Sequence, residues 1–254
     1  MATDAFWLEK YFFETREYFL GEADSGNFDL KIMQLSDLHI REMGSTLRKV
    51  AESVNAHQPD LLLLSGDSID DGKNLRLLGQ FLASIDHSIP KFAIPGNWEY
   101  WGNADMEKLR AIYAAHNAEL LINQSRQIRL KELSVSITGT DDFVAGNADI
   151  DQAISQFIPG DYHLLLNHCP AYSDTIAEVL RQRKIPYDLI LSGHTHGGQI
   201  TLAGWAPFKP NGSGKYLNGW YEDVKMYVSK GIGTSILPLR FMARAEITLF
   251  WLKK

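Results

Sequence analysis

Residues 191–199 read Leu-Ser-Gly-His-Thr-His-Gly-Gly-Gln and follow directly on the apolar run Tyr187-Asp188-Leu189-Ile190-Leu191. The apolar run predicts a short buried strand, and the glycines after it let the backbone come close to a ligand. A strand that ends in Gly-His-x-His projects His194 and His196 from one sheet edge. A pair of metal ligands would be placed in this way. Two nearby histidines are more often unrelated surface or packed residues. Other parts of the chain must therefore show whether this pair binds a metal.

Length and composition indicate one large globular domain. The chain has 254 residues, of which 45% are hydrophobic, and this is enough for a substantial core. The net charge is −6 and there is no basic stripe, which argues against extended nucleic-acid binding and against a nuclease. Cys169 is the only cysteine, so an internal disulfide is excluded. No signal peptide or membrane-spanning stretch is apparent, and we expect a protein that is cytoplasmic or peripheral to the inner membrane.

The N-terminal segment, residues 1–29, differs in composition from the single domain expected over residues 30–254. Residues 6–20 mix large aromatic side chains with charged ones. As a helix this stretch would be amphipathic and would lie in a membrane interface, giving a peripheral membrane contact. As a strand, residues 18–20 would pack at the edge of a sheet.

Short apolar runs and helix-like stretches alternate from residue 30 onward. The expected strands are 31–35, 60–64, 91–94, 134–138, 162–166, 188–191, 225–228 and 245–251. The expected helices are 46–57, 74–84, 104–117, 149–157 and 173–183. This alternation predicts a layered α/β fold, and the late strands without helices between them predict mixed sheets.

Polar side chains follow five of the expected strands at the point where each strand ends. They are Asp37 and His39, Asp67 and Asp70, Asn97 and Glu99, His168, and His194 with His196. Ligands of open α/β sheets bind at the carboxyl ends of the strands, so these segments are expected to converge. Imidazole together with carboxylate favours Mn, Fe, Zn or Co. Seven potential ligands are too many for one ion, whereas two ions that share a carboxylate fit the count.

Taken singly, each segment also has an ordinary structural interpretation. Asp37 and His39 would cap the next segment, Asp67 and Asp70 would be turn residues, Asn97 would serve its own turn, and His168 would be a core histidine. Five such strand endings in one chain favour the shared metal site.

The same residues resemble the ordered motifs of the calcineurin-like metallophosphoesterases. The family motifs are Asp-x-His, Gly-Asp-x-x-Asp, Gly-Asn-His-Asp/Glu, a lone His and Gly-His-x-His. They stand here as Asp37-Leu38-His39, Gly66-Asp67-Ser68-Ile69-Asp70, Gly96-Asn97-Trp98-Glu99, His168 and Gly193-His194-Thr195-His196. The later stretches 228–235, 237–241 and 246–249 are similar to the small bacterial YkuE-type subgroup. The resemblance implies a four-layer α/β/β/α sandwich of two mixed sheets with a di-metal centre on its rim.

The resemblance also implies a role for each motif residue. Asp37, His39 and His196 would hold the first ion, Asp67 would bridge, and Asn97, His168 and His194 would hold the second. Two divalent ions there would polarise a phosphoryl group and lower the pKa of a bridging water that acts as the nucleophile. The catalytic residues would be His39, Asp67 and Asn97, and Mn is the ion expected to serve best in an assay. Asp70 and Glu99 would orient ligands or be solvated surface residues.

Trp98 departs from the family pattern. The family usually has His at this position, and an indole cannot transfer a proton to a leaving oxygen. General acid catalysis is typically worth about 10² to 10⁴ in rate, so we expect slow hydrolysis of alkyl monoesters. Diesters, pyrophosphates and aryl esters are the better substrates on this interpretation. Trp98, Tyr100 and Trp101 would form an aromatic wall against the substrate, or would pack at the sheet rim.

Residues 204–221 form a long Gly-, Pro- and aromatic-rich segment after the histidine pair, which is a candidate substrate lid. Its Lys209 and Lys215 would meet a second phosphate of the substrate, or would be solvated loop residues.

The function expected from these residues is metal-dependent hydrolysis of a phosphodiester or pyrophosphate bond in a phosphorylated small molecule or a lipid-linked substrate. A more specific alternative is a UDP-diacylglucosamine pyrophosphatase of lipid A synthesis, since some relatives cleave that compound. Another alternative is a binding or scaffold protein that keeps its metals but has weakened catalysis, which Trp98 motivates. The presence of all seven ligands argues against a pure scaffold. No oligomeric state is predicted.

Overall fold

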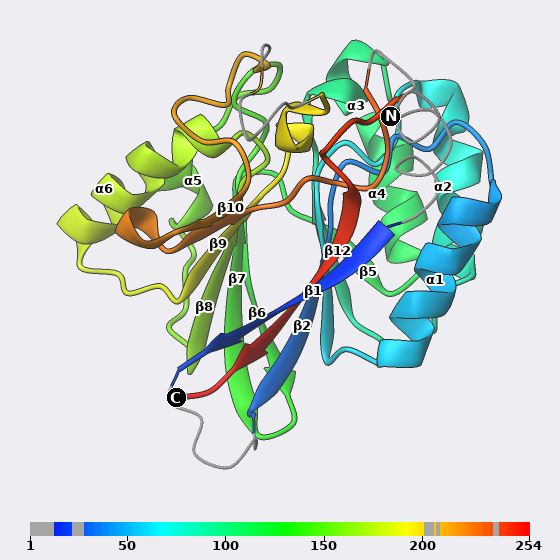
Figure 1. Cartoon of the computed structure of the whole chain (residues 1–254). Helices are drawn as coiled ribbons and strands as arrows, with labels where there is room; N and C mark the ends of the chain where they lie inside the picture. The colour runs from blue at the N-terminus through cyan, green and yellow to red at the C-terminus, as the bar shows by residue number, and fades with distance from the viewer. Residues whose placement is uncertain (1–12, 22–27, 201–205, 207–208, 236–238) are drawn as a thin grey trace.

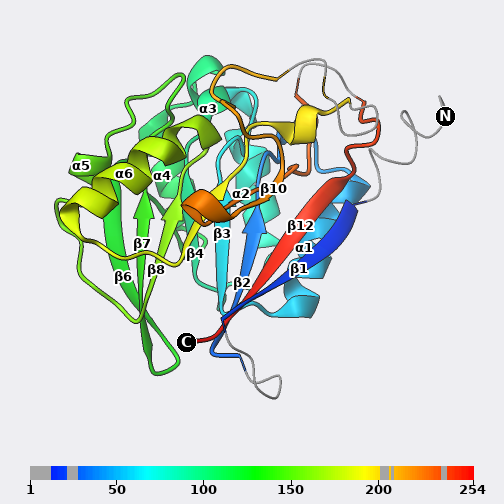
Figure 2. The same cartoon turned by 60° about the vertical axis from the view of Figure 1, so that its left-hand side comes forward.

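The computed structural model describes residues 13–21, 28–200, 206, 209–235 and 239–254. Within these residues, two six-stranded sheets face each other in the middle of the molecule (Figure 1). Helices cover the outer face of each sheet, on opposite sides of the molecule, as the second view also shows (Figure 2). The predicted four-layer α/β/β/α sandwich is therefore confirmed.

The first sheet has the spatial order β1 (Phe13–Leu20), β12 (Ala245–Leu252), β2 (Leu30–Leu35), β3 (Leu61–Ser65), β4 (Lys91–Ile94) and β5 (Ala118–Leu120). Strands β2 to β5 are parallel, whereas β12 is antiparallel to β2 and parallel to β1. Its outer helices are α1 (Ser45–His57), α2 (Leu75–Ala83) and α4 (Met106–Ala114). The short helices η2 (Gly72–Asn74) and α3 (Asn97–Trp101) lie in the connections.

The second sheet has the spatial order β10 (Gly219–Tyr221), β11 (Met226–Val228), β9 (Leu189–Ser192), β8 (Tyr162–Leu166), β7 (Leu133–Gly139) and β6 (Gln124–Leu130). Its four central strands are parallel and its two edge strands are antiparallel to their neighbours. Its outer helices are α5 (Ile150–Ala153) and α6 (Ser173–Arg183). Three short 3₁₀ helices are η3 (Pro170–Tyr172), η4 (His196–Gly198) and η5 (Glu222–Val224).

Alternate residues of the central strands enter different layers of the core. In β3, Leu61 and Leu63 pack between the two sheets, whereas Leu62 and Leu64 pack under the helices. In β9, Ile190 faces the helical layer while the leucines on either side of it face the opposite sheet. Successive side chains of a strand point to opposite faces, and both faces are buried here. This is why the sequence shows continuous apolar runs rather than an alternation of apolar and polar residues.

The structure corrects several expected elements. All eight expected strands are present, but β5, β6 and β10 were not predicted. β5 and β10 have three residues each, and β6, Gln124–Leu130, has exposed polar positions instead of an apolar run. The helix expected over residues 149–157 forms only at Ile150–Ala153, and the five-residue helix α3 was also not predicted.

The N-terminal stretch enters the first sheet. Phe13–Leu20 forms β1, which pairs with β12 in parallel along its whole length. The helical alternative is therefore wrong for these residues, while residues 6–12 lie outside the described part of the chain. None of the helices in the described ranges has both the length and the hydrophobicity needed to cross a bilayer.

Candidate metal centre

The predicted ligands lie on loops at one end of the two sheets. Asp37 and His39 follow β2, Asp67 follows β3, and Asn97 begins α3 after β4. His168 follows β8 in the second sheet, and His194 and His196 follow β9. In Figures 1 and 2, α3 lies at the upper end of the molecule, where the loops after the parallel strands meet. The carboxyl ends of parallel strands from two facing sheets thus bring all seven residues to one place.

The backbone is strained at five of these seven residues. Asp37, His39, Asp67, His194 and His196 have φ values of 51°, 46°, 52°, 72° and 51°. The left-handed region costs an L residue about 1–2 kcal/mol, although Asp and His enter it more often than most. Hydrogen bonds between neighbouring loops stabilise this backbone conformation. Asp37 N donates to Gly66 O at 3.1 Å, and His39 N donates to Asp67 O at 3.0 Å. Such clustered strain is typical of functional sites.

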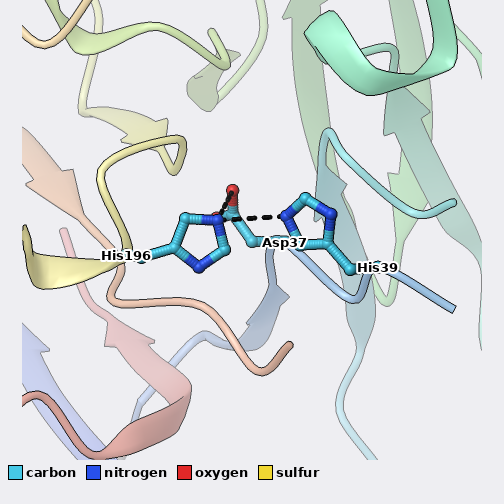
Figure 3. Close-up of side chains that lie close together, drawn as sticks. All are labelled: Asp37, His39 and His196. Carbon is cyan, nitrogen blue, oxygen red and sulfur yellow. Dashed lines mark hydrogen bonds and ion pairs between the residues drawn. The ribbon is translucent and has the colours of Figure 1, made fainter. Parts of the chain in front are cut away.

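The first cluster consists of Asp37, His39 and His196, all buried (Figure 3). Their potential ligand atoms all lie within 4.8 Å of one another. The Nε2 atoms of the two histidines are 3.0 Å apart, and His196 Nε2 is 3.6 Å from Asp37 Oδ1. In Figure 3 the ring of His196 turns toward both other side chains. A carboxylate and two imidazoles thus converge from both sheets on one point.

The second cluster consists of Asp67, His168 and His194, again buried and within 4.8 Å. His168 Nε2 lies 3.2 Å from Asp67 Oδ2, and His194 Nδ1 lies 2.8 Å from Asn97 Oδ1. Asp67 Oδ2 is also 3.7 Å from His39 Nε2 of the first cluster. One carboxylate oxygen therefore faces histidines of both clusters.

Hydrogen bonds on the second ring nitrogen orient the histidines of both clusters. His168 Nδ1 donates to the carbonyl of Ser65 at 2.8 Å, and His194 Nε2 donates to the carbonyl of Asn211 at 2.6 Å. His39 Nδ1 bonds the carboxylate of Asp70. In a neutral imidazole, a donor on one nitrogen leaves a lone pair on the other. The lone pairs of His168 and His194 therefore point into the second cluster.

Charges inside the site displace several pKa values. Burial favours the neutral ring of His196, and the neighbouring His39 and Arg240 cations lower the pKa of His196 further. Burial also opposes charge on His168, but the carboxylate of Asp67 raises the pKa of His168 well above its ordinary value. In turn, burial works against the Asp67 carboxylate, and His168 holds the pKa of Asp67 below its usual range. The buried Asp67 carboxylate therefore favours a positive charge beside it, either a proton on His168 or a cation bound in its place.

The donor set fits two divalent cations. His168 Nε2 is fully buried and has no hydrogen-bond partner among the described residues, although Asp67 Oδ2 is only 3.2 Å away. Ligand atoms that bind one ion at about 2.0–2.2 Å are themselves about 3 Å apart, so this spacing suits a shared cation. Imidazole with carboxylate is a set that Mn, Fe, Zn and Co accept. The assignment of each residue to one ion remains a prediction.

Asp70 and Glu99 are both withdrawn from solvent, but they support the site differently. Asp70 accepts from His39 and from Arg41, so it orients a predicted ligand. Glu99 accepts from the backbone N–H groups of Gly96 at 2.8 Å and Ser68 at 2.7 Å, so it holds two loops together. Burial and the nearby Asp67 carboxylate raise the pKa of Glu99 to about 7.

A cavity of about 360 Å³ adjoins the clusters, with Asp67, Asn97, His194 and His196 in its lining. Trp98 and Trp101 also line it, and the ring of Trp98 meets that of His39 edge-on at 6.0 Å between centroids. Tyr100 does not line this cavity, because its hydroxyl donates to Asp141 instead. Two of the three predicted aromatic contacts are therefore placed beside the clusters.

The two predicted lysine contacts lie elsewhere. Lys209 is exposed, and Lys215 pairs with Asp223 at 3.0 Å and with Asp174 at 3.4 Å. Neither lysine lines the cavity. Of the predicted lid, Pro210 and Asn211 do line it, whereas residues 204–205 and 207–208 lie outside the described ranges.

Two supporting arginines were not predicted. Arg41 donates to Asp70 and, at 2.7 Å, to the carbonyl of Ser235. Arg240 is fully buried, and its Nη2 lies 3.3 Å from His196 Nδ1. Arg240 occurs in the stretch 237–241, which carries part of the family resemblance, but nothing local in that stretch indicates a contact with the histidine pair.

Comparisons with known proteins give similarities in sequence and in fold. The sequence profile described as calcineurin-like phosphoesterase matches residues 30–198. The uncharacterized metallophosphoesterase YkuE of Bacillus subtilis is 31% identical, over 97% of this chain and 88% of that protein. The phosphodiesterase YaeI of Escherichia coli is 30% identical, over 96% of this chain and 89% of that protein. The crystal structure of a dimetal phosphatase from Danio rerio covers 90% of this chain and 94% of its own, at 11% identity and a TM-score of 0.48.

Proposed function

The chain belongs to the calcineurin-like phosphoesterase family, and we propose that it is a two-metal phosphohydrolase that cleaves a phosphodiester or pyrophosphate bond. The observation that carries the proposal is the position of Asp67. Its Oδ2 lies 3.2 Å from His168 Nε2 and 3.7 Å from His39 Nε2, so one carboxylate serves both clusters. The similarity to a protein named as a phosphodiesterase supports the diester as the substrate class.

Seven side chains of this chain would hold the ions. They are Asp37, His39 and His196 for the first, Asn97, His168 and His194 for the second, and Asp67 for both. Two divalent cations bound there would polarise the phosphoryl oxygens, lower the pKa of the attacking water and stabilise an in-line displacement. Only two of the seven ligands are carboxylates, so the loaded centre would keep a positive charge that attracts an anionic ester. The backbone N–H of Trp98 donates to Asp67 Oδ1 at 2.8 Å and keeps that carboxylate in place.

The nature of the leaving group follows from Trp98. Among the described residues that line the cavity, the titratable side chains are Asp67, His194 and His196, and all three belong to the clusters. A leaving oxygen there meets an indole where the family usually has an imidazole, and an indole does not protonate it. Aryl oxygens and phosphate groups depart without such help far more readily than alkoxides do. This supports diesters with a good leaving group, or pyrophosphates, over alkyl monoesters.

The test compares the rates of hydrolysis of three substrates. They are the diester bis(p-nitrophenyl) phosphate, the aryl monoester p-nitrophenyl phosphate and a simple alkyl monoester. The protein is stripped with a chelator and then supplied with Mn, Zn, Fe, Co or Mg. We expect Mn or a neighbouring transition metal to restore diester hydrolysis, with alkyl monoesters the slowest substrates. An alkyl phosphomonoester that proved the best substrate by a wide margin would refute this assignment. No hydrolysis at a metal content near two per chain, with a pyrophosphate substrate also tried, would indicate a binding protein instead.

A further inference from the structure

The cavity beside the clusters is apolar on the side away from the predicted ligands. We propose that it binds an apolar alkyl group carried by the phosphodiester substrate. This inference rests on the proposed function and names the substrate class of the same site. A nucleotide or a substrate with a second phosphate is the competing class.

Apolar side chains from three separate segments form the wall. Trp98 and Trp101 come from α3, Ile200 follows η4, and Pro210 belongs to the loop after the histidine pair. The two indoles meet edge to face, with ring centroids 5.6 Å apart. Trp101 is nevertheless 55% exposed, so a large apolar surface stands open at the rim. Covering such a surface with an alkyl group would be favourable by about 25 cal/mol for each Å² removed from water.

Several polar groups in the lining are already hydrogen-bonded within the protein. The Thr195 hydroxyl donates to the carbonyl of Leu217, and the Gln199 side-chain oxygen accepts from Ser235 N at 3.1 Å. The carbonyl of Asn211 accepts from His194. These groups are therefore engaged rather than offered to a base or a sugar hydroxyl, whose unpaired polar atoms would be costly to bury.

The cavity also lacks the charge that a second phosphate would require. Among the described residues that line it, none is Lys or Arg. Phosphate recognition normally uses Arg, Lys or a bound cation. Cations held by the two clusters would thus be the source of positive charge in the described lining, and they would be taken up by the reacting phosphoryl group.

The size of the cavity fits one such group. A volume of about 360 Å³ is at the lower end of the range of about 300–1,000 Å³ for small-molecule sites. The phosphoryl group would lie at the cluster end, and a single alkyl group would extend along Trp98 toward Ile200 and Trp101. The leaving oxygen of the second ester group would meet Trp98 at the cluster end, and the rest of that aryl or phosphoryl group would point to solvent.

The experiment is a series of p-nitrophenyl alkyl phosphates with methyl, butyl and octyl groups, hydrolysed by the Mn-loaded protein. Because each buried methylene contributes about 0.8 kcal/mol, kcat/KM should rise up to about fourfold per methylene until the cavity is full. A second readout is calorimetric binding of the matching alkyl methylphosphonates, whose alkoxide is too poor a leaving group for hydrolysis during the titration. Their affinity should follow the same order.

Trp101→Ala should reduce the gain from methyl to octyl at least several-fold, both in kcat/KM and in phosphonate affinity. Trp101→Phe should retain most of the gain. Phe19→Ala is the matched control, because Phe19 is a 59% exposed aromatic residue on β1 and does not line the cavity. That variant should show the unchanged dependence on chain length.

The outcomes separate the two proposals. Hydrolysis of the methyl ester with no gain from longer chains, in rate and in binding, would overturn the alkyl site and leave the phosphodiesterase standing. Absence of both diester and pyrophosphate hydrolysis would overturn the proposed function, and the phosphonate titration would still decide what the cavity binds. Preference for an analogue with a second phosphate would also overturn the alkyl site.

Cleavage of a hexadecyl ester held in phosphatidylcholine vesicles would identify a membrane lipid as the source of the alkyl group. Cleavage of the free short-chain esters alone would identify a soluble diester.

Discussion

The two clusters use the same residue types but are supported in different ways. In the first cluster, His39 is held by the carboxylate of Asp70, which is itself paired with Arg41. In the second cluster, His168 and His194 are held by backbone carbonyls. The first cluster therefore depends on side chains that a substitution can remove. The histidines of the second cluster bond main-chain carbonyls, of Ser65 at the end of β3 and of Asn211 in the loop before β10, and a side-chain substitution at these partners does not remove the carbonyl.

The difference follows from where the segments lie in the sheets. His168 follows β8 and bonds the last residue of β3, Ser65, so the ends of two central strands from facing sheets meet directly. His39 lies two residues further beyond the end of β2 than His168 lies beyond the end of β8, and its Nδ1 bonds the carboxylate of Asp70 instead of a carbonyl. Partners of this kind typically change metal affinity by about 10- to 100-fold. The comparison can be tested one cluster at a time.

The largest effect is expected for Asp67→Asn, because the Asp67 carboxylate faces histidines of both clusters. An amide has no negative charge to share between two cations, so the bound metal should fall from near two ions per chain to one or fewer. Diester hydrolysis should fall by more than the roughly 100-fold upper range for supporting partners. Metal analysis measures the number of bound ions, and bis(p-nitrophenyl) phosphate kinetics measure the loss of hydrolysis. Asp71→Asn, an exposed carboxylate nearby, is the control, and equal losses in the two variants would contradict the shared role.

Gly66→Ala should damage the second cluster selectively. Gly66 has a φ of +95°, and an added Cβ would lie 2.3 Å from His168 Nδ1. The ring would have to move away from Ser65, and we expect loss of one ion per chain with a lower melting temperature. Gly219→Ala is a matched control, since Gly219 has a φ of +86° and no atom within 4 Å of an added Cβ. If the two variants lost metal equally, backbone strain rather than crowding of His168 would be the cause.

Asp70→Ala should weaken the first cluster and spare the second. Removing the carboxylate frees the ring of His39, so affinity for one of the two ions should fall by about 10- to 100-fold. Titration of the stripped protein with Mn would then show two separated binding steps. Asp70→Asn keeps an acceptor oxygen, so its affinity for this ion should lie between the affinities of the wild type and of Asp70→Ala. A uniform weakening of both steps would show that the clusters are not independently supported.

Arg41→Ala should have the smallest effect. The Arg41 side chain is 45% exposed, and exposed ion pairs contribute only about 0–1 kcal/mol. Affinity for the first ion should therefore fall by no more than about fivefold, and less at high salt. Arg48→Ala, an exposed arginine on α1, is the control for loss of charge. A loss as large as that of Asp70→Ala would mean that Arg41 determines the position of the carboxylate.

Much of this architecture was predictable because its signals are local. Apolar runs such as 61–64 and 188–191 identify strands buried on both faces, and a polar residue directly after such a run identifies a strand end. The edge strands β6 and β10 escaped prediction because their stabilisation comes from pairing with a neighbouring strand rather than from their own side chains. The same holds for β1, whose mixture of aromatic and charged residues also fits an amphipathic helix.

The sequence by itself determined the fold class, the strands that carry the site and the seven residues that the resemblance nominates. The resemblance also implied how these residues divide between two ions. Only the tertiary structure shows which side chains meet in space, because the partners are remote in the chain: Asp37 meets His196, and Asp67 meets His168. It also decided that Asp70 supports a side chain while Glu99 supports backbone, and that Lys215 pairs away from the cavity. Strand order and facing sheets set these contacts, and neither is encoded in the spacing of residues along the chain.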